Sequence, residues 1–242
     1  MNYNKINNLL GWFSFLTALI VYTLTLEPSA SFWDSGEFIA SAHKLQVVHQ
    51  PGAPLFLMLG KVFSLLAGND TSRVAFWINM CSAVASAATI LFLFWTITAL
   101  AKKIIWKNGE KLSNWELITI MGSGLVGALA YTFSDSFWFS AVEAEVYALS
   151  SLCTAIVFWA ILKWDQHADE PYSDRWLIFI AYVMGLSIGV HLLNLLAIPA
   201  IALVYYFRRS KKRTSAGTLL ALLAGIIILA FIQYGIFQYT IK

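Results

Sequence analysis

Long apolar stretches separated by charged residues dominate the chain, and their lengths predict membrane-spanning helices. A helix needs about 20 apolar residues to cross the roughly 30 Å hydrocarbon core of a bilayer. Charge-free segments that approach or exceed this length occupy residues 6–26, 74–101, 117–134, 146–162, 176–207 and 214–241. The pattern therefore predicts an all-α, polytopic membrane protein.

The segment 176–207 is too long for one span and is predicted to form a hairpin. As a single straight helix it would measure about 48 Å at 1.5 Å per residue. Glycine and proline interrupt helices, and this segment contains Gly185, Gly189 and Pro199 around the polar residues His191 and Asn194. We therefore expect two short helices, at about 176–190 and 195–207, with His191 and Asn194 at the tip. The total is then about seven transmembrane helices.

The distribution of basic residues supports this hairpin. Lysine and arginine accumulate on the cytoplasmic side of membrane proteins. With the hairpin and a cytoplasmic amino terminus, 12 of the 16 basic residues lie inside, namely Lys5, Lys102, Lys103, Lys107, Lys111, Lys163, Arg175, Arg208, Arg209, Lys211, Lys212 and Arg213. Only Lys44, Lys61, Arg73 and Lys242 lie outside, whereas one uninterrupted helix would move the basic run 208–213 to the outer side.

Composition excludes a soluble protein. Hydrophobic residues make up 59% of the chain and charged residues 12%, against about 45–50% and 25% in soluble domains. The basic run 208–213 is interpreted as an anchor near anionic lipid, not as a nucleic-acid site. A G-x-G-x-x-G pattern at 122–127 lies inside a predicted span, where small residues let helices approach closely. Cys81 and Cys153 lie in apolar runs and are predicted to be buried thiols.

Residues 27–73 form the longest segment outside the spans, and we expect two interfacial helices in it. Asp34, Glu37, Ser41 and Lys44 recur at helical spacing, which predicts a helix with one polar stripe lying in the membrane interface. Residues 55–67 form a second apolar helix that is too short to span. The prolines between them favour an extended, rigid turn.

Asp34 and Glu37 allow two interpretations. They are either the solvent-facing side of an interfacial helix, or a general base and its helper at the membrane surface. Under the second interpretation, Trp33 and Phe38 would exclude water from the site and raise the pKa of a carboxyl group. The spacing alone leaves both open.

Two motifs in the predicted outer loops resemble a known family. They read Trp33-Asp34-Ser35-Gly36-Glu37-Phe38 and His49-Gln50-Pro51-Gly52-Ala53-Pro54-Leu55. This pair resembles the first outer loop of the GT-C superfamily of membrane glycosyltransferases, and more narrowly its protein O-mannosyltransferase-like family. Gln50 departs from that family's pattern, which usually has proline there. Ala144-Glu145-Val146-Tyr147 resembles the family's second outer loop, and the segment 185–199 its short helix pair.

The resemblance implies roles for individual residues. Asp34 would be the catalytic base, and Glu37 would share that role or position the acceptor. Glu143 and Glu145 would face different ways on a helix, and the family match favours Glu145 as the catalytic one. The donor phosphate would be bound by residues that can donate hydrogen bonds or carry positive charge, namely Lys61, Arg73, His49, His191 and Asn194. No metal ligand is assigned, but a divalent metal is left open because some relatives use one.

The implied function is transfer of a sugar, plausibly mannose, from a polyprenyl-phosphate donor to a protein hydroxyl or other acceptor. We expect residues 1–242 to form one membrane domain, the catalytic half of a GT-C fold and a piece of a longer chain. The expected location is a bacterial inner membrane, with the site on the outer, periplasmic side. Lipids are expected partners, nucleic acid is not, and a larger membrane assembly is left open.

Two other functions are consistent with the pattern. Broken helices and outer acids also occur in transporters and flippases for lipid-linked or anionic solutes. Against this, the predicted spans place no charged residue deep in the membrane, where a translocation path usually has one. A non-catalytic subunit of a membrane complex is the third interpretation.

Overall fold

The computed structural model describes residues 2–106 and 112–236, and this part of the chain is helical without any strand. Lys107, Lys111 and Lys242, to which the charge pattern assigned sides, lie outside the described residues. The α-helices are α1 Tyr3–Leu24, α2 Ser35–Lys44, α3 Pro54–Ser64, α4 Val74–Ile105, α5 Asn114–Thr132, α6 Asp135–Val142, α7 Val146–His167, α8 Arg175–Ile188, α9 Ile198–Arg209 and α10 Ser215–Ala230. The prediction of an all-α membrane protein is confirmed.

Five helical segments of the described chain are long and apolar enough to cross a membrane. They are Tyr3–Leu24, Thr71–Ile105, Val146–His167, Leu192–Arg209 and Ser215–Gly235. A sixth span results if α5 and α6, bent by 64° at a short break, count as one. Helix α8 was expected to be one of about seven transmembrane helices, but it has only 14 residues, fewer than a full crossing needs.

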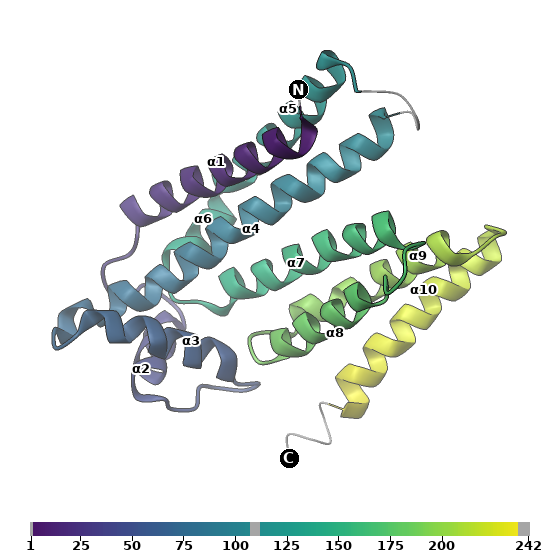
Figure 1. The fold of residues 1–242 in the computed structure, drawn as a ribbon. Coiled ribbons are helices and arrows are strands. Elements are labelled where there is room, and N and C mark those ends of the chain that lie inside the picture. Colours follow the sequence, from purple (N-terminus) through teal and green to yellow (C-terminus); the bar gives the residue numbers. More distant parts are fainter. Residues whose placement is uncertain (1, 107–111, 237–242) are drawn as a thin grey trace.

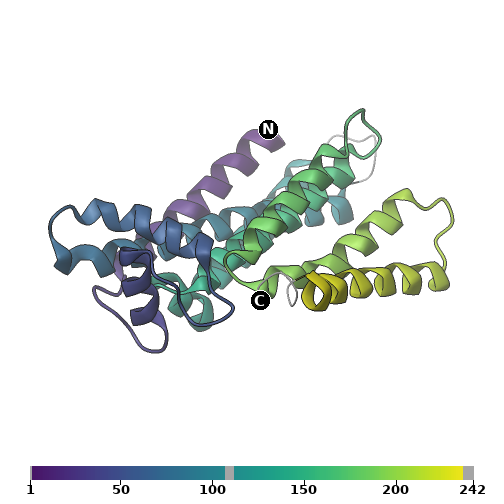
Figure 2. The same cartoon turned by 90° about the horizontal axis from the view of Figure 1, so that it is seen from below.

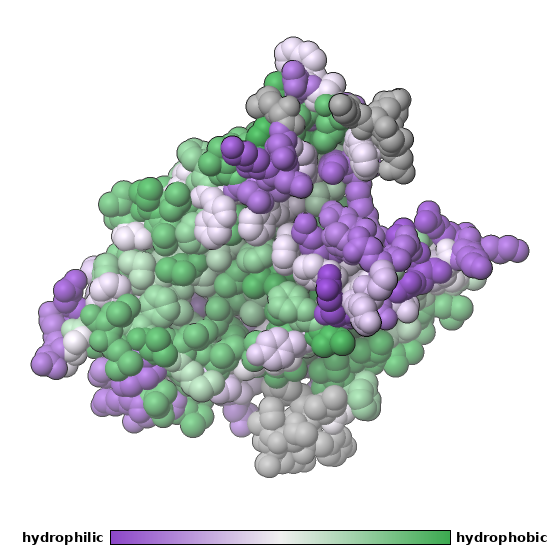
Figure 3. Space-filling view, in the orientation of Figure 1, coloured by the Kyte–Doolittle hydropathy of each residue, from purple (hydrophilic) through white to green (hydrophobic). Residues whose placement is uncertain are grey.

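The helices form an elongated bundle centred on α4, which packs against α1, α5 and α7 (Figure 1). Helix α8 packs on α7, while α10 packs on α9 at the edge of the bundle. One end of the bundle carries α2 and α3, as Figure 2 shows from a second direction. On the face in Figure 3, hydrophobic residues cover the middle and hydrophilic residues gather towards both ends, as expected of a membrane protein.

Small residues set the close packing of α5 on α4. A Cβ added at Gly124 would lie 2.5 Å from the Thr98 side chain, and one at Gly127 would lie 2.5 Å from Ile97. At Gly124 a Cβ would meet both Thr98 and the Phe94 ring, whereas at Gly127 it would meet only the movable end of the Ile97 side chain. The two glycines lie where α5 contacts α4, as the interpretation of the pattern as helix packing requires. Gly122, the first glycine of the pattern, has nothing within 4 Å of such a Cβ.

The predicted hairpin is present, with its tip at the α2–α3 end of the bundle. Helix α8 ends at Ile188, the chain turns, and a 3₁₀ helix, η3 (Leu192–Ala197), leads into α9. His191 lies at the turn, as predicted. The turn docks on α3, where the Leu55 N–H donates to the Gly189 carbonyl at 2.7 Å. A Cβ at Gly189 would lie 3.2 Å from the Leu55 Cβ, so this glycine makes the docking close.

Gly185 makes no comparable contact, since a Cβ there would meet nothing within 4 Å. One expectation about the hairpin needs correction. Asn194 was expected at the exposed tip, but it lies within η3 and is fully buried. Its side-chain N–H donates to the Ser187 hydroxyl at 3.0 Å, so it ties η3 to α8.

Both helices predicted within residues 27–73 are present as α2 and α3. Ser41 does not belong to the exposed polar stripe of α2, since it is buried beside Phe38 on the face that packs inwards. The close contact of α2 with α3 relies on Gly60, where an added Cβ would lie 2.9 Å from that of Ala42. Cys81 and Cys153 are free and buried, as predicted.

Candidate active site

Three segments far apart in the sequence meet around a cavity of about 230 Å³ at the α2–α3 end of the bundle. The first is the start of α2 with the loop that follows it, the second is the junction between α6 and α7, and the third is the turn after α8. Their polar contributions are Asp34, His49, Gln50, Glu145, Tyr147 and His191. Asp34 and His191, which are more than 150 positions apart in the chain, both line this one cavity.

Glu37 holds His49 in place. One Glu37 carboxylate oxygen accepts from the His49 backbone N–H at 2.8 Å, and the other lies 2.8 Å from the imidazole Nδ1. The other ring nitrogen, Nε2, lies 3.9 Å from the Asp34 carboxylate. Hydrogen bonding to Glu37 raises the pKa of His49, and the charges of Glu37, Asp34 and Glu145 add to this. The same hydrogen bonds lower the pKa of Glu37.

Glu145 is the buried acid of the cavity. It immediately precedes α7 in an extended backbone conformation, and the residue is only 6% exposed. Burial raises the pKa of Glu145 to about 7, with further contributions from the negative charges of Glu143 and Asp34. A carboxyl group with such a pKa exchanges its proton near neutral pH, which suits acid–base chemistry.

Glu143 is buried as well but does not line the cavity. Its carboxylate accepts a hydrogen bond from the Ser31 hydroxyl, and burial raises its pKa. Only Glu145 reaches the cavity, as expected. The reason differs, however, because neither residue lies on a helix; α6 ends at Val142 and α7 begins at Val146.

The expectation of a dry carboxyl group beside Trp33 and Phe38 is wrong for the α2 acids. Trp33 is 87% exposed and therefore shields nothing. The side chain of Asp34 is 58% exposed and that of Glu37 is 40% exposed. The carboxyl group that burial affects most in this cavity is that of Glu145, which a different segment contributes.

His191 presents its Nε2 edge as a neutral donor. Its Nδ1 accepts a hydrogen bond from the Leu193 N–H at 3.1 Å, which leaves the proton of the neutral ring on Nε2. Burial lowers the pKa of His191. The ring lies 5.4 Å from that of Tyr147, centroid to centroid.

Tyr147 also lines the cavity, although it is not among the site residues predicted from the sequence. It belongs to the Ala144-Glu145-Val146-Tyr147 motif, and its position two residues after Glu145 is the signal that would have pointed to it.

Three residues predicted to bind the donor phosphate lie elsewhere among the described residues. The Lys61 ammonium group donates to the His43 carbonyl at 2.5 Å and so links α3 to α2. Arg73 is exposed at the start of α4, beside Asp70. Asn194 is buried against α8. None of the three lines the cavity.

Asp34, Glu37 and His49 also form a group whose donor atoms lie within 4.8 Å of one another. Two carboxylates and an imidazole suit a divalent cation. A cation there would either displace the hydrogen bond between Glu37 and Nδ1 or use Nε2, which faces Asp34.

The chain has relatives among known proteins. One is a protein O-mannosyl-transferase tmem260 of Dictyostelium discoideum, 27% identical over 198 residues, which cover 80% of this chain and 22% of the relative. Another is the protein O-mannosyl-transferase TMEM260 of Mus musculus, 27% identical over 174 residues, which cover 72% of this chain and 22% of the relative. The chain thus spans about a fifth of the length of these relatives. No solved structure matches it.

The sequence model of one family covers most of the chain. That family is described as the protein O-mannosyl-transferase TMEM260 N-terminal domain, and its model matches residues 34–214. The match begins at the cavity residue Asp34 and extends past the hairpin to the basic turn before α10. The chain therefore belongs to the family of protein O-mannosyl-transferase TMEM260 N-terminal domains.

Proposed function

We propose that the chain forms the catalytic membrane module of a GT-C type glycosyltransferase, which transfers a mannosyl group from a polyprenyl phosphate to a protein hydroxyl. The observation that carries this proposal is the meeting of Asp34, His49, Glu145 and His191, from three distant segments, at one cavity. The family and the names of the relatives support the reaction class.

In the proposed reaction, the acceptor hydroxyl oxygen attacks the anomeric carbon of the donor sugar. The bond from that carbon to the phosphate oxygen breaks, and the polyprenyl phosphate leaves with the bonding electrons. Asp34 accepts the proton of the hydroxyl group, because its carboxylate is open to the cavity and to solvent. Such a base typically accelerates a reaction about 10²–10⁴-fold.

His49 and His191 are proposed to bind the departing phosphate. The raised pKa of His49 favours its cationic form, and a charge-assisted hydrogen bond to phosphate is stronger than a neutral one. His191 offers a neutral Nε2 donor from the opposite side of the cavity. Glu37 acts on the reaction through His49, as a positioning residue.

Glu145 is proposed to bind the sugar or the acceptor hydroxyl. With a pKa of about 7 it can donate a hydrogen bond when protonated and accept one when ionised. The charge of Glu145 also contributes to the raised pKa of His49.

The proposed orientation places the cavity on the outer face of a bacterial inner membrane, with the amino terminus in the cytoplasm. Basic residues support it, since Lys102, Lys103 and the run 208–213 lie at the opposite end of the bundle from the cavity. Positive charge collects on the cytoplasmic side of membrane proteins.

A transfer assay tests the proposal. Membranes containing the protein, labelled polyprenyl-phosphate mannose and an acceptor protein should yield labelled acceptor. We expect Asp34→Asn to reduce turnover by about 100-fold or more. We expect His191→Ala mainly to weaken donor binding, by several-fold to about tenfold.

Asp135→Asn is the matched control, because Asp135 is an exposed acid at the same end of the bundle that does not line the cavity. It should behave as the wild type. Full turnover by Asp34→Asn would remove Asp34 from the role of base. Lipid-linked sugar uptake into proteoliposomes without any acceptor labelling would contradict the transferase assignment itself.

A further inference from the structure

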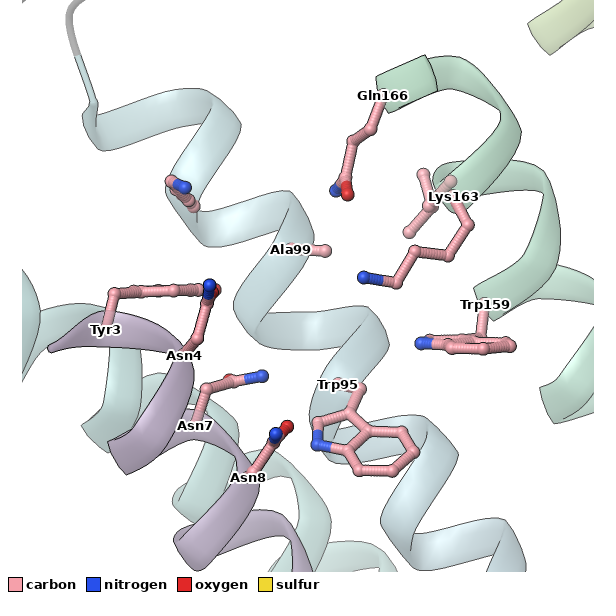
Figure 4. Close-up of a pocket in the computed structure, with 11 residues that line it drawn as sticks. Tyr3, Asn4, Asn7, Asn8, Trp95, Ala99, Trp159, Lys163 and Gln166 are labelled. Carbon is pink, nitrogen blue, oxygen red and sulfur yellow. The ribbon is translucent and has the colours of Figure 1, made fainter. Parts of the chain in front are cut away.

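A second cavity lies at the opposite end of the bundle from the candidate active site. It has a volume of about 330 Å³ and is bounded by the first turns of α1 and the last turns of α4 and α7. Figure 4 shows Asn7, Trp95, Lys163 and Gln166 directed towards the space between these three helices. Its size is within the range of small-molecule sites.

The cavity carries positive charge without a counter-ion. Lys102 and Lys163 both line it, and no acidic residue does so among the described ones. Neither lysine forms an ion pair with a described acid; each instead lies over an aromatic ring, Lys102 at 4.5 Å from the centroid of Tyr3 and Lys163 at 5.8 Å from that of Trp159. Two ammonium groups facing one partly enclosed space repel each other, and a bound anion would remove this repulsion.

In a neighbouring cavity, two of the cations form ion pairs with acids. This cavity, of about 810 Å³, shares Lys102 with the first, and its other charged residues are Lys103, Asp165, Arg208 and Arg213. Lys103 pairs with Asp165 there. Arg208 pairs with Asp169 and lies 3.9 Å from Asp165. The two cavities therefore differ in their linings, since the neighbour contains Asp165 whereas the cavity lined by Lys163 contains no acid among the described residues.

Besides the two ammonium groups, the cavity is lined by side-chain amides, which are neutral hydrogen-bond donors. Asn4, Asn7 and Asn8 project from α1, and Gln166 from α7. The carbonyl oxygen of Asn7 is buried, and its amide nitrogen points into the cavity in Figure 4. Donors on three helices thus surround a space of a few hundred cubic ångströms, an arrangement that suits an anion with several acceptor oxygens.

The position of the cavity favours a lipid as the source of that anion. Lys102 and Lys163 lie in the last turns of two apolar helices long enough to span a membrane. Tyr3, Trp95 and Trp159 form aromatic walls around them. Aromatic rings and snorkelling lysines at the ends of spans mark the depth at which phospholipid head groups lie.

We propose that this cavity binds the phosphate of an anionic membrane lipid, between α1, α4 and α7. The site is separate from the candidate active site and does not depend on the proposed reaction. By joining three helices at one end of the bundle, the bound phosphate would also stabilise their packing.

Native mass spectrometry of the purified protein in detergent tests the proposal, with phosphatidylglycerol, phosphatidylcholine and inorganic phosphate as separate probes. We expect phosphatidylglycerol to bind in preference to phosphatidylcholine. The double variant Lys102→Gln/Lys163→Gln should lose about tenfold or more in phosphatidylglycerol affinity, because each charge-assisted bond contributes substantially. Lys163→Arg, which keeps the charge, should retain most of the binding.

Lys211→Gln/Lys212→Gln is the matched control, since it removes the same charge from exposed positions at the same end of the bundle. It should change the affinity by less than about twofold. If the double variant in the cavity unfolds, the single change Lys163→Gln, compared with Lys163→Arg, gives the same information. Phosphatidylglycerol affinity that is the same in all variants would overturn the proposal. Lysine-dependent binding of inorganic phosphate without any lipid preference would overturn the lipid as its source.

Discussion

At the scale of single residues, the hydrogen bond to Glu37 is the main cause of the raised pKa of His49. We expect Glu37→Gln to lower the titration midpoint of His49 towards the ordinary histidine value, because the variant removes the charged acceptor that raises this pKa. Nuclear magnetic resonance of histidine-labelled protein, with His49→Ala for assignment, measures the change.

The control for this prediction is Glu170→Gln. His167 and Glu170 form a similar pair, 2.8 Å apart, at the other end of the bundle. Removing that pair should leave the midpoint of His49 unchanged. An unaltered midpoint in Glu37→Gln would show that the Glu37 contact does not control the charge of His49.

Glu145 should make folding stability depend on pH. Its raised pKa means that the folded protein keeps a proton that the unfolded chain loses above about pH 4.5. The stability associated with that proton is complete below the unfolded pKa and is lost as the pH rises through about 7. Glu145→Gln carries no such proton, so its stability relative to the wild type should increase with pH.

Between about pH 5 and about pH 8, the free energy of unfolding of Glu145→Gln should rise by roughly 1–2 kcal/mol relative to that of the wild type. This figure allows for screening by the solvent in the cavity. Thermal unfolding in detergent at several pH values measures it. Asp135→Asn, an exposed acid at the same end, should show no such trend. A constant difference between Glu145→Gln and the wild type across this range would mean that Glu145 has an ordinary pKa.

At the scale of elements, the packing of α5 on α4 depends on the register of the glycines. Gly124→Ala should destabilise the protein by about 1–3 kcal/mol, because its Cβ would lie 2.5 Å from the Thr98 side chain and 2.8 Å from the Phe94 ring. Gly122→Ala, in the same helix, meets nothing within 4 Å. It should be neutral or stabilising by up to about 1 kcal/mol, since alanine favours helices.

Melting temperatures of the two variants in one detergent give this comparison directly. Equal effects of the two substitutions would show that α4 and α5 do not approach each other at Gly124. A selective loss at Gly124 would agree with close contact of the two helices.

At the scale of the whole molecule, the two ends of the bundle should face opposite sides of the membrane. Val47, 90% exposed beside the candidate active site, lies at one end, and Lys211 lies in the exposed turn before α10 at the other. We expect Val47→Cys to react with a membrane-impermeant maleimide in spheroplasts. Lys211→Cys should react only after the membrane is permeabilised.

The native cysteines, Cys81 and Cys153, are buried and should react little, so the wild type is the control. Labelling of both engineered cysteines from one side would contradict the hairpin topology. Labelling with the sides exchanged would reverse the proposed orientation while leaving the fold unchanged.

The sequence by itself determined the fold class, most of the spans and the first acid-bearing loop. The length of an apolar run can be counted directly along the sequence and compared with the thickness of a bilayer. For this reason α1, α4 and α7 begin and end within a few residues of their predicted bounds. Glycine and proline revealed the break at His191 for a similar reason, because they act on the local backbone. The motif around Asp34 indicated where to look for an acid site.

Only the tertiary structure decided which acids and bases become neighbours at the cavity. Glu37 was expected to share the role of base or to position the acceptor, and the fold brings its two oxygens to His49. The carboxyl group with the raised pKa is that of Glu145, because desolvation and the charges of Glu143 and Asp34 act across space. In the same way, Lys61 and Arg73 lie away from the cavity, while Lys102 and Lys163 meet in another. Such effects depend on which residues become neighbours, and helix packing determines that.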